Sequence, residues 1–414
     1  MRRIISIVVV GLLWSIECAY GTEPQTSRAQ YDLNQLLSMA MERNPSLAVV
    51  EAEGGESRGR LLGAQAYPNP ELKVEAGPGR ALDGPPNRGT EESVRFSQPL
   101  EWVPKRSARI KAAEQGVEVS EFERKDAVFR VTAEVASAFY ALLGGQRELM
   151  LTVQTLTAVE QLAATARKRV EAGEAAKFER VKAEVELQRA AKEMERARSR
   201  VAQARAALAA TVGGGVEEEF EVSGEFPEGR AGLSLESLLE EARRRHPIIQ
   251  AHERDRARRA ALLDQAKASR IPDVSLFGGF DREIDRETYR AGVTIPLPLW
   301  SQRQGEIAEA TAGARRAEAK ARQARLELTR GITQAYEQYR IANGQLDLFR
   351  KGFLRQSEEA VEIARKSYRL GEVSLLELLD AQRVAFQVNR EYYQAQMDLA
   401  TALAQLERLT GGLP

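Results

Sequence analysis

Two segments, "ARKRVEAGE" at 166–174 and "ARKSYRLGE" at 364–372, share five identical residues and lie about two hundred positions apart. The likeness extends well beyond them. Residues 33–72 align without a gap on residues 235–274, and "SQPLEWVPKRSARI" at 97–110 aligns on "TIPLPLWSQRQGEI" at 294–307. Self-similarity at a long spacing is typical of repeated structural units. The sequence therefore predicts two copies of one unit.

The two units are predicted at 22–215 and 233–414, with a linker at 216–232. Residues 1–21 have the pattern of a secretory signal, with Arg2 and Arg3 before an apolar stretch that is too short to span a bilayer. An alternative is a lipoprotein that is cut before Cys18. Either pattern predicts an exported protein.

Composition excludes several classes of protein. The chain has 60 basic and 60 acidic residues, which argues against binding of nucleic acid through a net positive surface. If cleavage follows Gly21, no cysteine remains, and the only histidines are His246 and His252. We therefore predict no disulfide, no cofactor and no resident metal site. His246 precedes a proline and is predicted to be a structural turn residue.

Long helices are predicted from the positions of the prolines, because a proline inside a helix costs about 3 kcal/mol. None occurs at 105–226 or at 300–413, and both tracts are rich in strong helix formers. Gly173 and Gly371 each follow basic residues and are candidate C-caps. Each tract is therefore predicted to be a helical hairpin of two very long helices, with arms on the order of 100 Å long.

Two pairs of short segments alternate between apolar and polar residues, at about 71–100 and at about 273–297. They predict two β-hairpins whose strands of roughly ten residues match the length of transmembrane strands. Trp102 and Trp300 stand just past two of the strands, where an aromatic girdle would lie at the membrane interface. Four strands cannot close a barrel, so closure requires other copies. Three chains with about twelve strands are the smallest attractive solution.

With these features in place, the sequence resembles the TolC-type outer-membrane efflux family from about Tyr31 to Gly411. The resemblance implies a mainly α fold with a small transmembrane β part, assembled as a homotrimer with a 12-stranded β-barrel in the outer-membrane lipid and an α-helical barrel in the periplasm. It also implies a periplasmic adaptor and an inner-membrane RND-type pump as partners. The stretches "AYPNPEL" at 66–72 and "QPLEW" at 98–102 are similar to the heavy-metal branch, the CzcC-like and CusC-like ducts.

No enzyme motif is present, so the candidate site is a channel gate. Glu377 and Asp380 are three apart on the predicted helix and match by position the family's acidic aperture residues. Glu179 and Tyr368 are similar to residues that tie the closed helices together. Val373 stands where the family has a basic residue, which predicts closure by packing instead. The hairpin tips, with Gly173 and Glu174 in one and Gly371 and Glu372 in the other, are the predicted adaptor contact.

Other functions are compatible with parts of this pattern. The same architecture serves ducts for drugs or secreted proteins, since a fold alone does not choose its cargo. A periplasmic adaptor would have a single hairpin, and a coiled-coil scaffold would not explain the four alternating segments.

Overall fold

The computed structural model describes residues 29–80, 88–230 and 232–412. The predicted signal at 1–21 and Cys18 lie outside these residues. The first half contains β1 (Ala29–Tyr31), α1 (Leu33–Arg43), α2 (Pro45–Gln65), β2 (Glu71–Arg80), β3 (Arg88–Leu100), α3 (Val103–Glu171) and α4 (Lys177–Val212). The second half contains β4 (Phe220–Val222), α5 (Leu235–Arg245), α6 (Pro247–Ala268), β5 (Val274–Arg282), β6 (Glu287–Thr294), α7 (Gln304–Leu348), η1 (Phe349–Phe353), α8 (Leu354–Leu370) and α9 (Leu375–Thr410).

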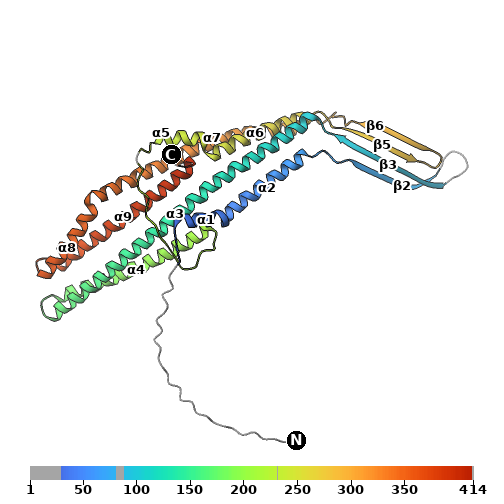
Figure 1. The fold of residues 1–414 in the computed structure, drawn as a ribbon. Helices are drawn as coiled ribbons and strands as arrows, with labels where there is room; N and C mark the ends of the chain where they lie inside the picture. Colours follow the sequence, from blue (N-terminus) through green and yellow to red (C-terminus); the bar gives the residue numbers. More distant parts are fainter. Residues whose placement is uncertain (1–28, 81–87, 231, 413–414) are drawn as a thin grey trace, which may run out of the picture.

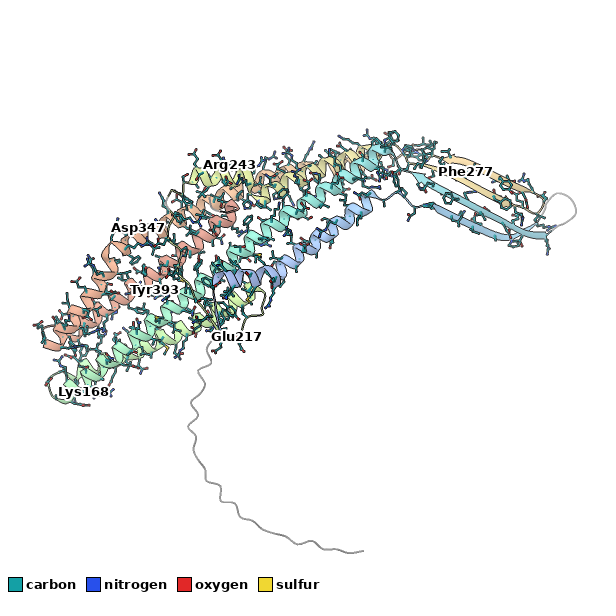
Figure 2. The ribbon with its side chains drawn as sticks, viewed as in Figure 1. Lys168, Glu217, Arg243, Phe277, Asp347 and Tyr393 are labelled. Atoms are coloured by element: carbon teal, nitrogen blue, oxygen red, sulfur yellow. The ribbon has the colours of Figure 1, made fainter. Side chains whose placement is uncertain are left out.

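The molecule is an elongated, slightly curved wall with the sheet at one end and the hairpin tips at the other (Figure 1). Side chains cover it along its length, with Lys168 near the tips and Phe277 in the sheet (Figure 2). The sheet has the order β2-β3-β5-β6. In the level next to the sheet, α2 packs on α3, α3 on α6 and α6 on α7. In the level toward the tips, α4 packs on α3, α3 on α9 and α9 on α8. Each level is thus four elements wide.

Equivalent caps join the short helices in the two halves. The Asn44 side chain accepts a hydrogen bond from the Ser46 amide and donates one to the Thr211 carbonyl at the end of α4. His246 accepts from the Ile248 amide through Nδ1, which leaves Nε2 to donate to the Arg408 carbonyl near the end of α9. Burial lowers the pKa of His246, which favours the neutral ring that these two hydrogen bonds require. His246 is therefore a structural turn residue, as predicted.

The first hairpin follows the prediction. α3 is a continuous helix of 69 residues, which corresponds to about 100 Å at 1.5 Å per residue. Its buried residues, among them Val131, Val135 and Phe139, form a core with Leu36 of α1 and Leu208 of α4. A single long helix thus connects the sheet to the tip.

In the second hairpin, the prediction of one unbroken outgoing helix is wrong. α7 and α8 are separated by a π-helical turn, η1, in which Gly352 has φ 124°. Only glycine adopts this conformation without strain. The buried Phe349 stacks on Phe353 and meets Tyr392 of α9 edge-on. π-bulges bend helices. The regular α-helix is therefore interrupted at the point where this aromatic group packs.

Two further features differ from the sequence-based expectation. β6 ends at Thr294, although the alternating pattern continues to Leu297, because Pro296 and Pro298 have no amide hydrogen for a ladder. The segment 216–232 contains β4, which pairs in parallel with β1. This two-stranded ribbon was not predicted, because strands of three residues carry little periodicity.

Candidate functional site at the sheet and the hairpin tips

The four-stranded sheet exposes one apolar face. In register, Leu72 pairs with Phe96 and Phe96 with Gly278, while Val94 pairs with both Val74 and Phe280. Side chains on this face are open to the surroundings, and Phe96 is 52% exposed. The other large apolar residues that are exposed on the sheet are Leu72, Val74, Val94, Leu100, Leu276, Tyr289 and Val293. A soluble protein buries such a face, whereas a membrane strand presents it to lipid.

The opposite face of the sheet is polar and carries charges of both signs. Lys73 pairs with Glu75 at 2.8 Å, and Arg290 of β6 pairs with Asp281 of β5 at 3.3 Å. The Arg95 guanidinium lies 5.7 Å from the centre of the Phe277 ring. Alternation along each strand therefore separates an apolar surface from a charged one, which suits lipid on one side and water on the other.

The two predicted girdle tryptophans occupy the boundary between sheet and helices. Trp102 precedes α3 and is 41% exposed, and Trp300 lies between β6 and α7 and is 91% exposed. Both rings are exposed at this boundary, and we propose that they contact the membrane interface.

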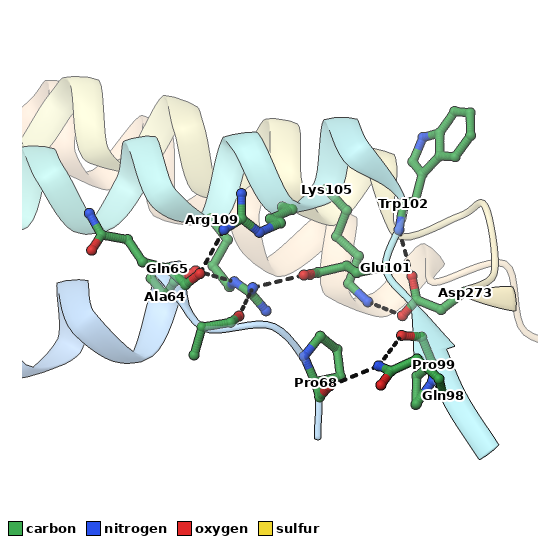
Figure 3. A network of polar contacts seen from close by, with 12 residues as sticks. Ala64, Gln65, Pro68, Gln98, Pro99, Glu101, Trp102, Lys105, Arg109 and Asp273 are labelled. Carbon is green, nitrogen blue, oxygen red and sulfur yellow. Dashed lines mark hydrogen bonds and ion pairs between the residues drawn. The ribbon is translucent and has the colours of Figure 1, made fainter. Parts of the chain in front are cut away.

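A polar network fixes the junction between the sheet and α3 (Figure 3). Arg109 donates to the Ala64 and Ala66 carbonyls at the end of α2, and it pairs at 2.7 Å with Glu101, whose side chain is only 3% exposed. Lys105 and the Trp102 amide both donate to Asp273, which stands directly before β5. We call these residues, namely Glu101, Trp102, Lys105, Arg109 and Asp273, the junction clasp.

The clasp gives a physical role to the motif at 97–110, which the sequence showed as part of the internal repeat and, at 98–102, as a family resemblance. Gln98, which belongs to this motif, donates to the carbonyl of Pro68 in the stretch at 66–72 (Figure 3). In the second copy, Pro298 stands at the position of Glu101, so the buried carboxylate is absent there. A charged residue between a strand and a helix in one copy alone was the signal that could have found it.

Both hairpin tips end their outgoing helix in the same way. Gly173 and Gly371 each have φ 78°, and the amides of Glu174 and Glu372 bond back to the Arg169 and Ser367 carbonyls. This is the Schellman pattern that glycine favours. Glu174 and Glu372 are exposed, so the tips present backbone turns and carboxylates to the surroundings.

Glu377 and Asp380 lie in the first turns of α9 and are both exposed. The Glu377 carboxylate accepts from the Ser374 amide at 2.7 Å and hydroxyl at 2.9 Å, and these hydrogen bonds lower the pKa of Glu377. Because the pKa is lowered in the folded protein, the ionised carboxylate stabilises the fold at pH values above the ordinary pKa of a glutamate. This stabilisation is lost as the pH falls through the lowered pKa. Asp380 lies 3.9 Å from Arg383. Glu377 thus has a capping role that sequence reasoning missed.

Tyr368 and Glu179 are brought together, as the resemblance implied. The Tyr368 hydroxyl donates to the Glu179 carboxylate at 3.3 Å, which links the two hairpins. Burial raises the pKa of Tyr368, and the Arg169 guanidinium lies 5.1 Å from its ring centre. Val373 packs against a buried cluster that includes Leu375 and Leu378. Arg169 was not predicted, because it reaches Tyr368 from the other hairpin.

An elongated wall that ends in an exposed amphipathic sheet defines a subunit of a membrane channel. The family model described as outer membrane efflux protein matches residues 36–214 and 238–412. The chain therefore belongs to the outer membrane efflux protein family. It resides in the outer membrane, its helical part lies in the periplasm, and it is not an enzyme.

Relatives and solved structures agree with this assignment. The chain is 28% identical over 391 residues to the cobalt-zinc-cadmium resistance protein CzcC of Cupriavidus metallidurans, covering 94% of this chain and 92% of the other. A structure of the outer-membrane channel OprN superposes with a TM-score of 0.78 at 21% identity, covering 92% and 90%. A structure of CusC superposes with a TM-score of 0.77 at 19% identity, covering 93% of each chain. The TolC-like fold is thereby confirmed.

Two properties of the described residues bear on other functions. Within the ranges 29–80, 88–230 and 232–412, no group of three or more His, Cys, Asp or Glu side chains could hold a metal ion. In the same ranges, α3 alone is a helix long and apolar enough to cross a membrane by length and composition, and half of that apolar stretch is buried in the protein. Residues of this helix, among them Val131, Val135 and Phe139, belong to the hydrophobic core described above.

Proposed function

We propose that the protein is a passive homotrimeric duct that carries substrates from a pump and adaptor to the exterior. The observation that supports this most strongly is the sheet, in which β2 and β6 are edge strands. An unpaired strand edge in hydrocarbon leaves amide and carbonyl groups without partners, at several kcal/mol each. Pairing β2 of one copy with β6 of the next removes every edge.

The helical levels support the same assembly. α2 and α7 lie at the two sides of the level next to the sheet, and α4 and α8 lie at the two sides of the level toward the tips. Exposed apolar residues are present on these flanks, including Phe178 and Val181 on α4 and Ile363 and Leu370 on α8. A neighbouring copy would cover them in a head-to-tail ring, and a ring of three gives about twelve strands.

The proposed gate lies at the tips. Three copies of Glu377 and Asp380 would place about six carboxylates around the axis, which favours cations at the entrance. The hydrogen bond between Tyr368 and Glu179 and the packing of Val373 would hold the closed arrangement. The tip residues Gly173, Glu174, Gly371 and Glu372 would contact the periplasmic adaptor, which in turn would bind an inner-membrane RND-type pump.

The proposed cargo is heavy-metal cations. The support is the likeness to the cobalt-zinc-cadmium resistance protein over nearly the whole of both chains. The carboxylates proposed for the entrance also suit cations. A duct for drugs or secreted proteins would share the fold, so the cargo needs its own test. Family membership excludes the adaptor and scaffold alternatives.

Deletion of the gene is expected to lower tolerance of the host to zinc, cobalt and cadmium, while tolerance to a panel of drugs stays unchanged. The reason is that a metal pump without its duct cannot discharge across the outer membrane. Growth in graded metal and drug concentrations, with and without a plasmid copy of the gene, measures this. A deletion strain that loses drug tolerance alone would contradict the proposed cargo.

Replacing Glu377 with Gln and Asp380 with Asn is expected to reduce the cation preference of single channels in a planar bilayer severalfold, because the neutral groups no longer attract cations. A matched control is Glu372→Gln, which removes an exposed charge at the tip outside this helix face. Unchanged conductance and ion preference in the double variant would remove both residues from the gate.

A further inference from the structure

A cavity of about 180 Å³ lies between α3, α4 and α9, and so its wall is built from both hairpins. Its apolar lining includes Val159 of α3, Ala190 of α4, and Leu379 and Phe386 of α9. Val159 and Leu379 are themselves buried. Arg189 and Arg383 at its edge are exposed, so the cavity is open to the surroundings on that side. An apolar space of roughly 150 Å³ is large enough for one benzene ring. The size and lining therefore fit a single aromatic ring.

Most polar groups around this cavity already have partners. The hydroxyls of Thr152 and Thr155 donate to carbonyls of their own helix, each at 2.8 Å. Glu186 pairs with Lys182 at 3.3 Å, Arg189 at 3.1 Å and Arg383 at 3.7 Å. Three cations surround one carboxylate, so the cavity disfavours a further cation.

Gln382 is the exception among the described lining residues. Its side-chain oxygen is buried and has no hydrogen-bond partner there. A buried acceptor without a partner is unfavourable, and a ligand that donates one hydrogen bond to it removes that cost. The cavity thus offers an apolar space with one free acceptor.

We propose that this cavity binds a neutral single-ring aromatic molecule with one hydrogen-bond donor, of the phenol class. The ring would contact Leu379 and Phe386, and the hydroxyl would donate to Gln382. Because the cavity exists only where α9 packs against α3 and α4, a bound ligand favours this arrangement of the hairpins. The consequence for gating, namely a smaller open population, rests on the proposed function.

The test uses the full protein in lipid nanodiscs and two fluorinated probes, 4-fluorophenol and 4-fluorotoluene, followed by fluorine NMR. We expect 4-fluorophenol to bind about tenfold more tightly than 4-fluorotoluene, as one neutral hydrogen bond allows. Gln382→Leu should abolish this preference while binding of 4-fluorotoluene persists. Ala190→Leu should weaken both probes at least tenfold by filling the space. Gln394→Leu, on the same helix but outside the cavity, is the matched control.

Binding of 4-fluorophenol that is equally tight in the wild type, Ala190→Leu and Gln382→Leu would overturn the proposal, since the probe would then lie elsewhere, for example in lipid. Loss of the preference in Gln394→Leu as well would also overturn it. Bilayer conductance of the same preparation separates this result from the proposed function. A conducting protein without cavity binding refutes only the cavity, whereas a cavity that binds phenol in a protein that never conducts refutes only the channel.

Discussion

Replacing Phe96 with arginine is expected to prevent stable insertion of the protein into the outer membrane. Phe96 lies on the apolar face of β3 and pairs with Leu72 on one side and Gly278, at the middle of β5, on the other. An arginine on the lipid face near the bilayer midplane costs about 2–4 kcal/mol, and a trimer would carry three. We expect the amount of protein extracted from outer membranes by detergent to fall more than tenfold.

Ser97→Arg is the matched control for this change. Ser97 is the next residue of β3, so strand alternation places it on the charged face, where Arg95 already lies. We expect this variant to reach the outer membrane at close to the wild-type amount. Equal losses for the two variants would show that the apolar face does not contact lipid.

Replacing Arg109 with alanine is expected to destabilise the protein by about 3–5 kcal/mol, the usual cost of leaving a buried charge without its partner. Arg109 is the ion-pair partner of the buried Glu101, and it also bonds two carbonyls at the end of α2 (Figure 3). Without it, the end of α2 loses two hydrogen bonds to α3 and keeps the one that Arg106 donates to the Gln65 carbonyl. Thermal unfolding in detergent, followed by circular dichroism, measures the loss.

Arg58→Ala serves as the comparison for this variant. Arg58 lies on α2, the helix whose last carbonyls bind Arg109, but its ion pair with Glu51 is solvent-exposed on both sides. Such pairs contribute about 0–1 kcal/mol. An Arg109→Ala protein that melts at the same temperature as Arg58→Ala would show that the clasp does not stabilise the junction.

The sequence predicted the features that depend on local chemistry and on repetition. Long proline-free tracts fix helices such as α3, and alternation fixes β2 and β3, because both patterns follow from the period of the backbone. Glycine after a basic turn correctly located the tips at Gly173 and Gly371. The fold class followed from these elements together with the duplication.

Features that depend on distant contacts were not predictable. Gly352 stands among good helix formers, and only the packing of Phe349 on Tyr392 shows why the helix breaks there. The clasp joins Arg109 to the end of α2 and Lys105 to Asp273, more than 160 positions away along the chain. The pairing of β1 with β4 likewise joins two strands that are separated in sequence by nearly the whole first half of the chain.

The contacts around the hairpin tips were predicted only in part. Tyr368 and Glu179 do meet, but the sequence did not reveal that Glu377 bonds to Ser374 or that Arg169 approaches Tyr368. A capping box follows from the pair Ser374 and Glu377 three residues apart, so that signal was available. The contact with Arg169 depends on how the hairpins pack and has no local signature.

We propose that each chain supplies one third of a closed wall, with β2 of one copy paired to β6 of the next. Native mass spectrometry of protein extracted from the outer membrane in mild detergent tests it most directly, by counting chains in each particle. Three chains per particle, stable until the detergent is made denaturing, is the predicted result. Particles that contain a single chain and still conduct ions in a bilayer would contradict it.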